Sequence, residues 1–226
     1  MALRDDAMAI LRANDRGGFT IPTHGLYPYQ WNWDSAFTAL GLATFDPDRA
    51  WAEVTSLLAG QWPDGMIPSI LFRTEAQDYF PGPARWGPTP GPIPSTGVSQ
   101  PPVLATVVRK LTEGAPVRRA AVFEQLFAWH RWYHAARTYD GIVCTVHPWE
   151  TGRDNCPEWN IGLDRMAVAP DLEPYVRTDN KHSNPRFRPT QEQYDKYLTI
   201  VQFGRQIGWD QRRLTDEGPF LMADPN

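Results

Sequence analysis

The sequence lacks several features that would place it in a familiar class. Its 226 residues include only two cysteines, Cys144 and Cys156, which do not have the CxxC spacing of a metal or redox site. We therefore expect two free thiols. Lys and Arg are scattered, the formal net charge is −4 and the pI is near 5.7, so the chain has no basic stripe for binding nucleic acid.

Long hydrophobic runs are also missing. The opening stretch MALRDDAMAILRANDRGG interrupts every apolar run with Arg or Asp, so it cannot serve as a signal peptide. No segment reaches the roughly 18 apolar residues of a membrane span. These absences predict a cytoplasmic protein without a membrane partner. No Ca²⁺ or Zn²⁺ ligand pattern is present, so we expect neither a metal nor another cofactor.

Aromatic residues and proline are abundant instead. The chain has 10 Trp, 8 Tyr and 22 Pro although its mean hydropathy is only −0.48, and many of the rings lie in polar, turn-rich stretches. Rings bordered by carboxylates and amides suit a sugar, because a pyranose has an apolar C–H face and a polar rim. The alternative is that the tryptophans fill gaps between helices.

Apolar spacing predicts an all-α protein. Asp46 and Pro47 supply an N-cap and a first-turn proline, and Thr190 with Gln193 forms a capping-box pattern. We expect helices over residues 34–43, 46–59, 99–113, 116–138 and 190–207, and one short strand over residues 142–146. In the 116–138 helix, the spacing assigns Phe123, Leu126, Phe127, His130 and Tyr133 to the inner side.

The predicted helices form pairs with short turns inside each pair and long aromatic connections between pairs. One amphipathic hairpin cannot bury its own apolar face, so such hairpins close into a ring or stack as a solenoid. No motif recurs at a fixed period, which favours the ring. The connection Pro81–Pro102 contains Trp86, Ile93 and Val98, and we expect it to be an ordered loop beside a site rather than a flexible linker.

Two short stretches gather acids, amides and rings. HPWETGRDNCPEW, at residues 147–159, places three carboxylates and two tryptophans in thirteen positions. YPYQWNWDS, at residues 27–35, lies where a helix begins. Asp34 could accept hydrogen bonds from sugar hydroxyls or simply cap the helix, and the residues alone leave both interpretations open.

Four blocks of the sequence together resemble one known family. They are QWNWDSAFTALGL, QWPDGMIPSILF at residues 61–72, HPWETGRDNCPEW, and RFRPTQEQYDKYLTIV at residues 186–201. In this order they resemble glycoside hydrolase family 63, and most closely its bacterial mannosylglycerate hydrolase-like branch. The blocks are spread over residues 30–201 of the chain.

The resemblance implies an (α/α)6 barrel that hydrolyses an α-glycosidic bond with inversion, with Asp154 in the GRDN motif as the proton donor. Desolvation by Trp149, Pro157 and Trp159 would favour the neutral carboxyl that a general acid requires. Arg153 would favour the ionised form if it pointed inward, so we expect it to point away.

The same motifs imply a subsite for the non-reducing sugar. The family's binding residues correspond to Tyr27, Trp31, Asn32, Trp33, Asp34, Tyr79, Gln100 and the backbone around Gly152. We expect the Gln100 side chain to project from a loop mouth, although Tyr79 and Gln100 could also be solvated loop residues. Arg177 and Lys181 could contact an acidic aglycone such as glycerate, and a solvated face is the alternative for that pair.

The sequence departs from the family in one respect. Inversion requires a second carboxylate, roughly 6.5–9.5 Å from the acid, to activate water. The family supplies it from the later half of the barrel, and this chain ends at residue 226. We nominate none of the remaining glutamates as a substitute base. The ones considered are Glu150, Glu158, Glu192 and Glu217.

Five predicted helices also fall short of the twelve of a complete ring. We therefore expect residues 1–226 to form a single domain, an incomplete (α/α)6 barrel that is the N-terminal portion of a catalytic domain or a truncated copy of it. Such an open ring could associate with the missing C-terminal half or with a second chain.

The leading hypothesis is an inverting glycosidase for a small α-linked sugar compound such as mannosylglycerate or glucosylglycerate. The rival hypothesis is a non-catalytic carbohydrate-binding helical fragment. A third, a relative of another helical-toroid enzyme such as a trehalase or glucoamylase, is disfavoured by the order of the motifs.

Overall fold

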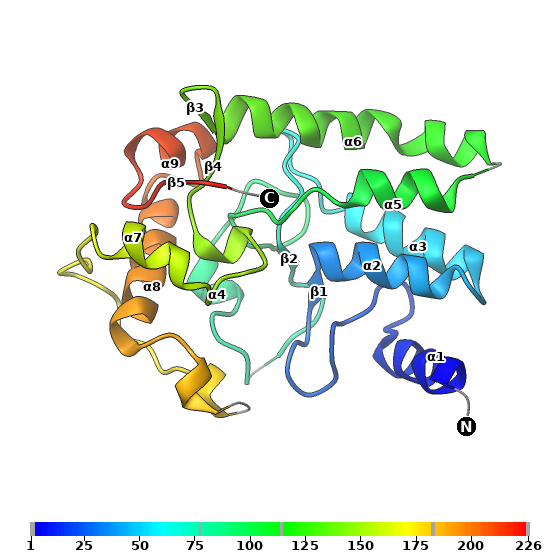
Figure 1. Ribbon diagram of the computed structural model, residues 1–226, viewed down its shortest axis with the longest axis horizontal. Coiled ribbons are helices and arrows are strands. Elements are labelled where there is room, and N and C mark those ends of the chain that lie inside the picture. Colours follow the sequence, from blue (N-terminus) through cyan, green and yellow to red (C-terminus); the bar gives the residue numbers. More distant parts are fainter. Residues whose placement is uncertain (1–2, 77, 114, 182–183, 225–226) are drawn as a thin grey trace.

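The computed structural model describes residues 3–76, 78–113, 115–181 and 184–224, and helices dominate it (Figure 1). The α-helices are α1 (Leu3–Asn14), α2 (Asn32–Leu42), α3 (Pro47–Leu58), α4 (Pro83–Trp86), α5 (Leu104–Leu111), α6 (Pro116–Ala136), α7 (Asn160–Leu163), α8 (Gln191–Gln206) and α9 (Gln211–Glu217). Short 3-10 helices are η1 (Pro148–Glu150), η2 (Pro157–Trp159), η3 (Asp179–Lys181) and η4 (Pro185–Phe187).

Side-chain caps fix the helix starts that the sequence signals most clearly. Asp46 accepts from the amide of Arg49 at the start of α3, as predicted. Thr190 and Gln193 form the predicted capping box of α8. By contrast, α5 begins only at Leu104 and its N-cap residue makes no side-chain cap, so the expected start near Ser99 is wrong.

The buried face of helix α6 overlaps the predicted one only in part, at Leu126 and the half-buried Tyr133. Its buried residues are Val122, Leu126, Trp129, Trp132 and Ala136. Phe123 and Phe127 are instead about half exposed and stack on each other, with ring centroids 5.9 Å apart. Aromatic residues lie on all sides of this helix, so apolar spacing alone could not identify the inner face.

In the described ranges, five short strands form two small antiparallel sheets. In the first, β1 (Gln30–Trp31) pairs with β2 (Ile70–Leu71), with Gln30 opposite Leu71. In the second, β4 (Ile142–Thr145), the predicted strand, lies between β3 (Thr138–Tyr139) and β5 (Met222–Ala223). The first sheet matters most for the site, because β1 runs directly into α2.

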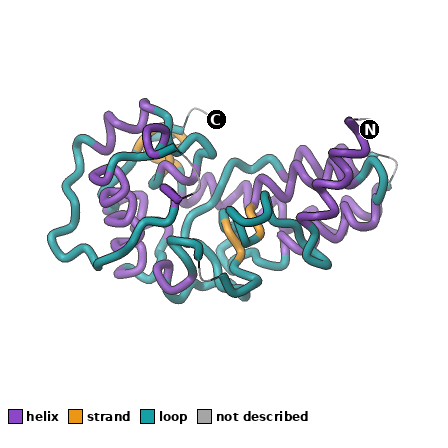
Figure 2. The backbone as a smooth tube through the Cα atoms, turned by 90° about the horizontal axis from the view of Figure 1, so that it is seen from below, coloured by secondary structure: helices purple, strands orange, loops and turns teal. Residues whose placement is uncertain are grey.

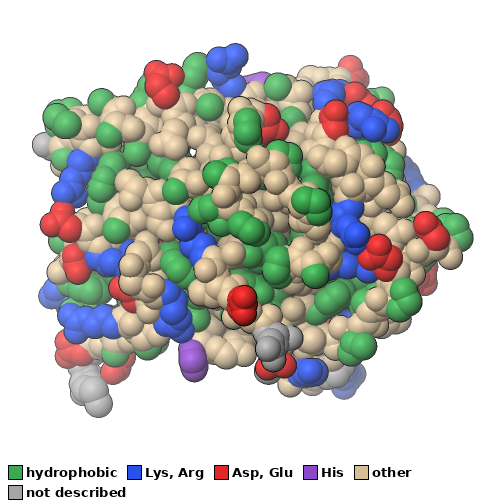
Figure 3. Space-filling view, turned by 180° about the vertical axis from the view of Figure 1, so that it is seen from behind, with side chains coloured by type: hydrophobic (Ala, Val, Ile, Leu, Met, Phe, Trp, Pro, Cys, Tyr) green, Lys and Arg blue, Asp and Glu red, His purple; other side chains and the backbone are tan. Residues whose placement is uncertain are grey.

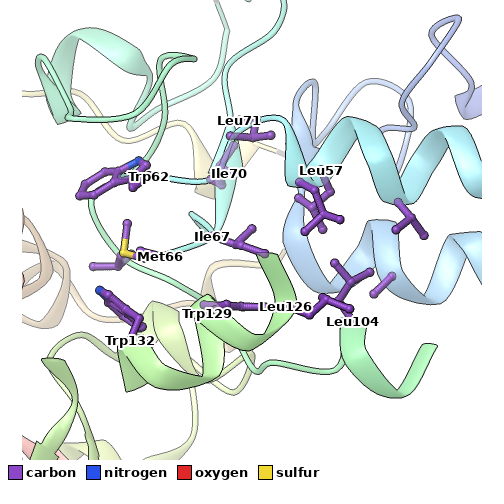
Figure 4. Packing of buried hydrophobic residues seen from close by; sticks show 14 of the residues in the cluster. Leu57, Trp62, Met66, Ile67, Ile70, Leu71, Leu104, Leu126, Trp129 and Trp132 are labelled. Atoms are coloured by element: carbon purple, nitrogen blue, oxygen red, sulfur yellow. The ribbon is translucent and has the colours of Figure 1, made fainter. Parts of the chain in front are cut away.

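The main core lies where α2, α3, α5 and α6 meet the segment 62–72 (Figure 4). Leu57 of α3, Leu104 of α5 and Trp129 of α6 are completely buried there, together with Ile67. A smaller cluster joins α8 to α7 and to Phe220. Figure 2 shows helices at both ends of the molecule, with long loops and the β1–β2 pair between them.

The long connection 81–102 is ordered, as predicted. It contains α4, and Phe72 and Ser69 donate backbone hydrogen bonds to Pro94 and Val98 within it. Trp86 and Val98 are each 1% exposed. The loop is therefore part of the packed structure and not a flexible linker.

The surface agrees with the mixed charge of the sequence. On the face in Figure 3, acidic and basic side chains are interspersed and do not separate by sign. Both cysteines are free, Cys144 buried and Cys156 half-buried, as expected. None of the helices in the described part of the chain is long and apolar enough to cross a membrane.

Candidate functional site

A cavity of about 430 Å³, here called the first cavity, is lined by both of the acid- and ring-rich stretches. Loop residues 78–81, Arg188 and Tyr194 are also among its lining residues. Eight of the nine predicted site residues line it: Tyr27, Trp31, Trp33, Asp34, Tyr79, Gln100, Gly152 and Asp154. Segments more than a hundred residues apart in the sequence therefore meet at one site.

The aromatic wall of the first cavity is built at the junction of β1 and α2. Trp31 is half-buried, and its ring lies 5.2 Å from that of Tyr27 and 5.5 Å from that of Tyr79, both in edge-on contacts. Trp33 is also half-buried. These rings expose part of their surface to the cavity, so they do more than fill the core, and they offer apolar faces to a ligand.

Asp34 lies in the first turn of α2 and faces the same cavity. The N-cap residue of α2 is Trp31, so capping does not explain Asp34. Burial raises the pKa of Asp34 to about 6, although hydrogen bonds from its own amide and from Trp33 partly offset this effect. A carboxyl group of this kind can accept hydrogen bonds from hydroxyl groups, and it titrates near neutrality.

Asn32 is the exception among the predicted lining residues. Its side chain is completely buried, and Nδ2 donates to the carbonyl oxygens of Ile67 and Pro68, each at 3.2 Å. It lies behind the wall and ties α2 to the segment after α3. The expectation that Asn32 lines the cavity is therefore wrong in this structure, because its amide is the partner of buried backbone carbonyls.

Gln100 is also more deeply placed than its position before two prolines suggested. It is 5% exposed, and its Oε1 accepts a hydrogen bond from the backbone amide of Trp33 at 3.2 Å. Tyr133 donates to the Gln100 carbonyl at 2.6 Å. Gln100 therefore does not project from a loop mouth, and neither it nor the half-buried Tyr79 is a solvated loop residue.

The segment 147–155, here called the acid segment, is irregular and is held by side chains. His147 is fully buried; its Nδ1 accepts from the amide of Trp149 at 3.0 Å, and its Nε2 lies 3.1 Å from the carbonyl oxygen of Tyr197. Because Nδ1 accepts a hydrogen bond, Nε2 must donate, which requires the neutral ring. Burial lowers the pKa of His147 to about 3, which agrees with this assignment.

Gly152 brings the acid segment against the aromatic wall. Its φ of +69° is in the left-handed region, and a Cβ built there would lie 2.3 Å from the ring of Trp33. Only glycine permits this approach without displacing the indole. The contact joins the two segments directly.

Asp154 lies at the end of the acid segment and is half-buried. Burial raises its pKa, while the positive charge of Arg188 partly opposes the shift. Tyr197 donates to the Asp154 carbonyl at 2.8 Å and Trp159 Nε1 donates to the Arg153 carbonyl at 2.8 Å, so the backbone on either side is fixed. The neutral carboxyl is thus favoured at a cavity wall.

The surroundings of Asp154 confirm part of the predicted environment. Trp149 lines the cavity and Trp159 is 1% exposed, whereas Pro157 is exposed and lines neither cavity. The Arg153 side chain points away, as expected, and forms a surface ion pair with Glu158 at 2.6 Å.

The cation nearest the acid is one that the sequence reasoning missed. Arg188 lines the first cavity, and its Nε donates to Asp179 at 3.2 Å. Arg177 also donates to Asp179, and its guanidinium lies over the ring of Tyr194. Lys181 is exposed on η3. Neither Arg177 nor Lys181 is among the lining residues. Arg188 lies in the block 186–201 that resembles the family, but nothing in the sequence of that block distinguished it from the neighbouring Arg186.

A second cavity of about 300 Å³ shares Asp154, Asn155, Arg188 and Pro189 with the first. Its other lining residues come from segments 156–160, 186–187 and 193–197. Asp154 therefore lies between two open spaces, one with aromatic walls and one mainly polar.

The four glutamates considered as substitute bases lie elsewhere in the described structure. Glu150 forms a buried ion pair with Arg137, and Glu158, Glu192 and Glu217 form ion pairs with Arg153, Lys196 and Arg213. None of the four lines the first cavity. Within the described ranges, no cluster of three or more His, Cys, Asp or Glu side chains could hold a metal ion.

Comparison with known proteins gives one consistent set of relatives. A model of the mannosylglycerate hydrolase MGH1-like glycoside hydrolase domain matches residues 27–226. A mannosylglycerate hydrolase of Thermus thermophilus is 49% identical over 228 residues, covering 96% of this chain and 55% of that protein. Mannosylglycerate hydrolase MGH2 of Selaginella moellendorffii is 47% identical over 223 residues, covering 95% and 46%.

A solved structure agrees in fold as well as in sequence. The crystal structure of a family 63 mannosylglycerate hydrolase from Thermus thermophilus, in complex with Tris and D-glycerate, matches with a TM-score of 0.90 and 47% identity. The match covers 97% of this chain and 54% of that one. The chain thus spans about half the length of the relatives it matches.

Proposed function

Because this chain belongs to the MGH1-like glycoside hydrolase family, we propose that it supplies the sugar-binding wall and the proton donor of an α-glycosidase. The substrate is a small α-linked sugar compound, mannosylglycerate or glucosylglycerate. The observation that carries the proposal is a half-buried Asp154, with a raised pKa, at the wall of a cavity lined by indole rings.

In the proposed reaction the protonated Asp154 gives its hydrogen to the bridging oxygen as the bond from that oxygen to the sugar breaks. Positive charge develops on the sugar ring as this bond breaks, and a water molecule that gives its proton to the base bonds to the anomeric carbon from the opposite face. The rings of Trp31 and Trp33 hold its apolar face, and Asp34 accepts hydrogen bonds from its hydroxyl groups. Asp34, with its own raised pKa, is assigned to binding and not to proton donation.

Cleavage with inversion is the stereochemical course we propose. It requires a base roughly 6.5–9.5 Å from the acid on the other side of the sugar. Among the described residues, none of the four glutamates considered lines the first cavity. We therefore propose that the base comes from outside this chain, in a continuation of it or in an associated polypeptide.

The positive charge of Arg188 could bind an acidic aglycone. Arg188 lines both cavities beside Asp154, where the leaving group must lie. A guanidinium group can hold a carboxylate by two parallel hydrogen bonds. Arg188 thus takes the place of Arg177 and Lys181 as the proposed contact for glycerate.

The architecture we propose is an incomplete (α/α)6 barrel in which residues 1–226 form one part of the catalytic domain. The mainly helical structure and the coverage of 54% of the matched crystal structure support it. The remaining helices and the base would then close the ring over the first cavity.

The test is hydrolysis of mannosylglycerate, glucosylglycerate and trehalose by the 226-residue chain and by the full-length product of its gene. We expect cleavage of one of the glycerate compounds, with the free sugar appearing first as the β-anomer in proton NMR. Initial formation of the α-anomer would contradict inversion. Binding of these compounds without turnover by either protein would instead support the rival proposal of a non-catalytic sugar-binding protein.

A further inference from the structure

A buried ion pair joins Glu150 of the acid segment to Arg137 and takes no part in the proposed chemistry. Arg137 at the end of α6 is completely buried and donates from Nη2 and Nε to Glu150 Oε1, at 2.9 and 3.1 Å. Its Nη2 also donates to Gln211 Oε1 at 2.6 Å, and its Cζ lies 4.7 Å from the ring centroid of Trp132. Helices α6 and α9 therefore hold this guanidinium in one orientation.

Glu150 uses its remaining acceptor capacity on two separate segments. Its Oε1 accepts from the amide of Ser99 at 3.2 Å, and its Oε2 accepts from the amide of Val146 at 3.0 Å. Val146 leads into the acid segment. Ser99 immediately precedes Gln100, which accepts from the amide of Trp33. One carboxylate thus connects the backbone that carries Asp154 to the aromatic wall.

We propose that Glu150, held by Arg137, is a positioning residue that fixes the acid segment at its distance from the Gln100–Trp33 side of the first cavity. The proposal rests on the proposed function in so far as Asp154 is the proton donor. Glu150 itself contacts neither the cavity nor a reacting atom. It acts through the two backbone amides.

Stability alone is a poor explanation for such a pair. Removing two charges from water costs about as much as their attraction returns, and apolar replacements of similar size are often neutral. An apolar pair cannot accept hydrogen bonds from two backbone amides that belong to different segments. The geometry therefore points to orientation as the contribution of Glu150.

The primary variant is Glu150→Gln. Whichever way the new amide is turned, its NH₂ group faces either the Ser99 amide or the Val146 amide, so one segment loses its acceptor. Two comparisons accompany it. The double variant Arg137→Gln with Glu150→Gln keeps the net charge of the pair at zero, and Leu57→Ala reduces stability in the core formed by α2, α3 and α5.

Two readouts separate positioning from a general loss of stability. The first is the titration of the Asp154 carboxyl carbon by ¹³C NMR in the 226-residue chain, where Arg188, Tyr79 and Tyr197 are the ionisable groups facing it. The second is kcat and KM of the full-length gene product, measured well below the melting temperature of every variant.

We expect Glu150→Gln and the double variant to move the pKa of Asp154 toward its ordinary value and to lower kcat by about tenfold or more. Leu57→Ala should change neither the pKa of Asp154 nor kcat, even if it lowers the melting temperature as much as the Glu150 variants do. An unchanged pKa of Asp154 in both Glu150 variants would overturn the proposal. A shift that the double variant restores would also overturn it, because charge alone would then be the cause.

These outcomes are distinguishable from failure of the proposed function. If Asp154→Asn retained full turnover, Asp154 would not be the proton donor. The NMR titration would still report whether Glu150 fixes the position of that side chain.

Discussion

The two segments that line the first cavity are built in different ways. The segment 30–34 is regular: β1 pairs with β2, and the chain passes directly into α2. The acid segment contains only η1 and a left-handed Gly152. Its backbone is held by side chains: His147 and Thr151 accept hydrogen bonds from its amides, and Trp159 and Tyr197 donate to its carbonyls. The wall that would bind the sugar is part of the helical scaffold, whereas the acid depends on side chains for its position.

A buried glutamate supports each segment, Glu53 from α3 and Glu150 from within the acid segment itself, and the two hydrogen-bond networks differ. Glu53 is completely buried and accepts from Ser35 Oγ at 2.6 Å, from Gln30 Nε2 at 3.3 Å and from Arg49 Nη2 at 2.9 Å. Arg49 also pairs with Asp15 after α1. Glu53 also accepts from the backbone amide of Thr20, but most of its contacts are with side chains of β1, α2 and α3. Glu150, besides its pair with Arg137, accepts hydrogen bonds from the backbone amides of Ser99 and Val146. A change at Glu53 should therefore loosen the scaffold, and a change near Glu150 should misplace the acid.

The largest effect is expected from the acid itself. In the full-length gene product, Asp154→Asn should lower kcat on the order of 10²–10⁴-fold, because an amide cannot donate the required proton. Affinity for the sugar should change little, since the aromatic wall is intact. Glu158→Gln, four residues away in a surface ion pair, is the control and should retain activity. Steady-state kinetics and calorimetry measure the two quantities.

Glu53→Gln should reduce the free energy of unfolding by about 2–3 kcal/mol, because the half-buried Arg49 loses one of its two carboxylate partners and keeps only Asp15. Glu158→Gln removes a surface carboxylate and should cost less than about 1 kcal/mol. Urea unfolding of the two variants measures the difference. Equal costs would mean that the buried network does not hold the aromatic wall.

Gly152→Ala tests the contact between the two segments. The new methyl group would overlap the Trp33 ring in a backbone conformation that disfavours alanine, and we expect a loss of about 2–3 kcal/mol. Gly141→Ala is matched, since φ is +77° and nothing lies within 4 Å of the added Cβ. That control should cost only about 1 kcal/mol. If the two variants were equally stable, the close packing of Gly152 on Trp33 would be wrong.

The smallest effect expected is a pH dependence arising from Asp34. The fold raises its pKa from 3.8 to about 6, so it favours the neutral form, and this contribution is complete below pH 3.8 and lost as the pH rises through 6. Asp34→Asn should remove that dependence and stabilise the protein at pH 7 by about 1–2 kcal/mol. Unfolding curves from pH 4 to 7 test this. If the wild-type free energy of unfolding instead rose from pH 4 to 7, and Asp34→Asn abolished that rise, the pKa of Asp34 would be lowered and not raised by folding.

The sequence predicted the starts of helices correctly where a single capping residue determines them. Asp46 and Thr190 cap their helices as expected because a short polar side chain next to an apolar repeat has few other roles. Phe123 and Phe127 were assigned to the wrong face, because rings occur all around α6 and only tertiary packing selects among them.

The candidate site shows the same limit. The family resemblance nominated Asp34 and Asp154, and the structure places both at the first cavity. The motifs could not show that Asn32 turns inward to Ile67 and Pro68, nor that Arg188 and not Arg177 borders the cavity. Those outcomes depend on which backbone carbonyls and carboxylates the fold brings within reach.

The most direct test is a crystal structure of the Asp154→Asn full-length gene product with mannosylglycerate bound. The account predicts the sugar ring in the first cavity against Trp31 and Trp33, its bridging oxygen within hydrogen-bonding distance of the side chain at position 154. A sugar bound elsewhere, or a bridging oxygen out of reach of that side chain, would contradict it.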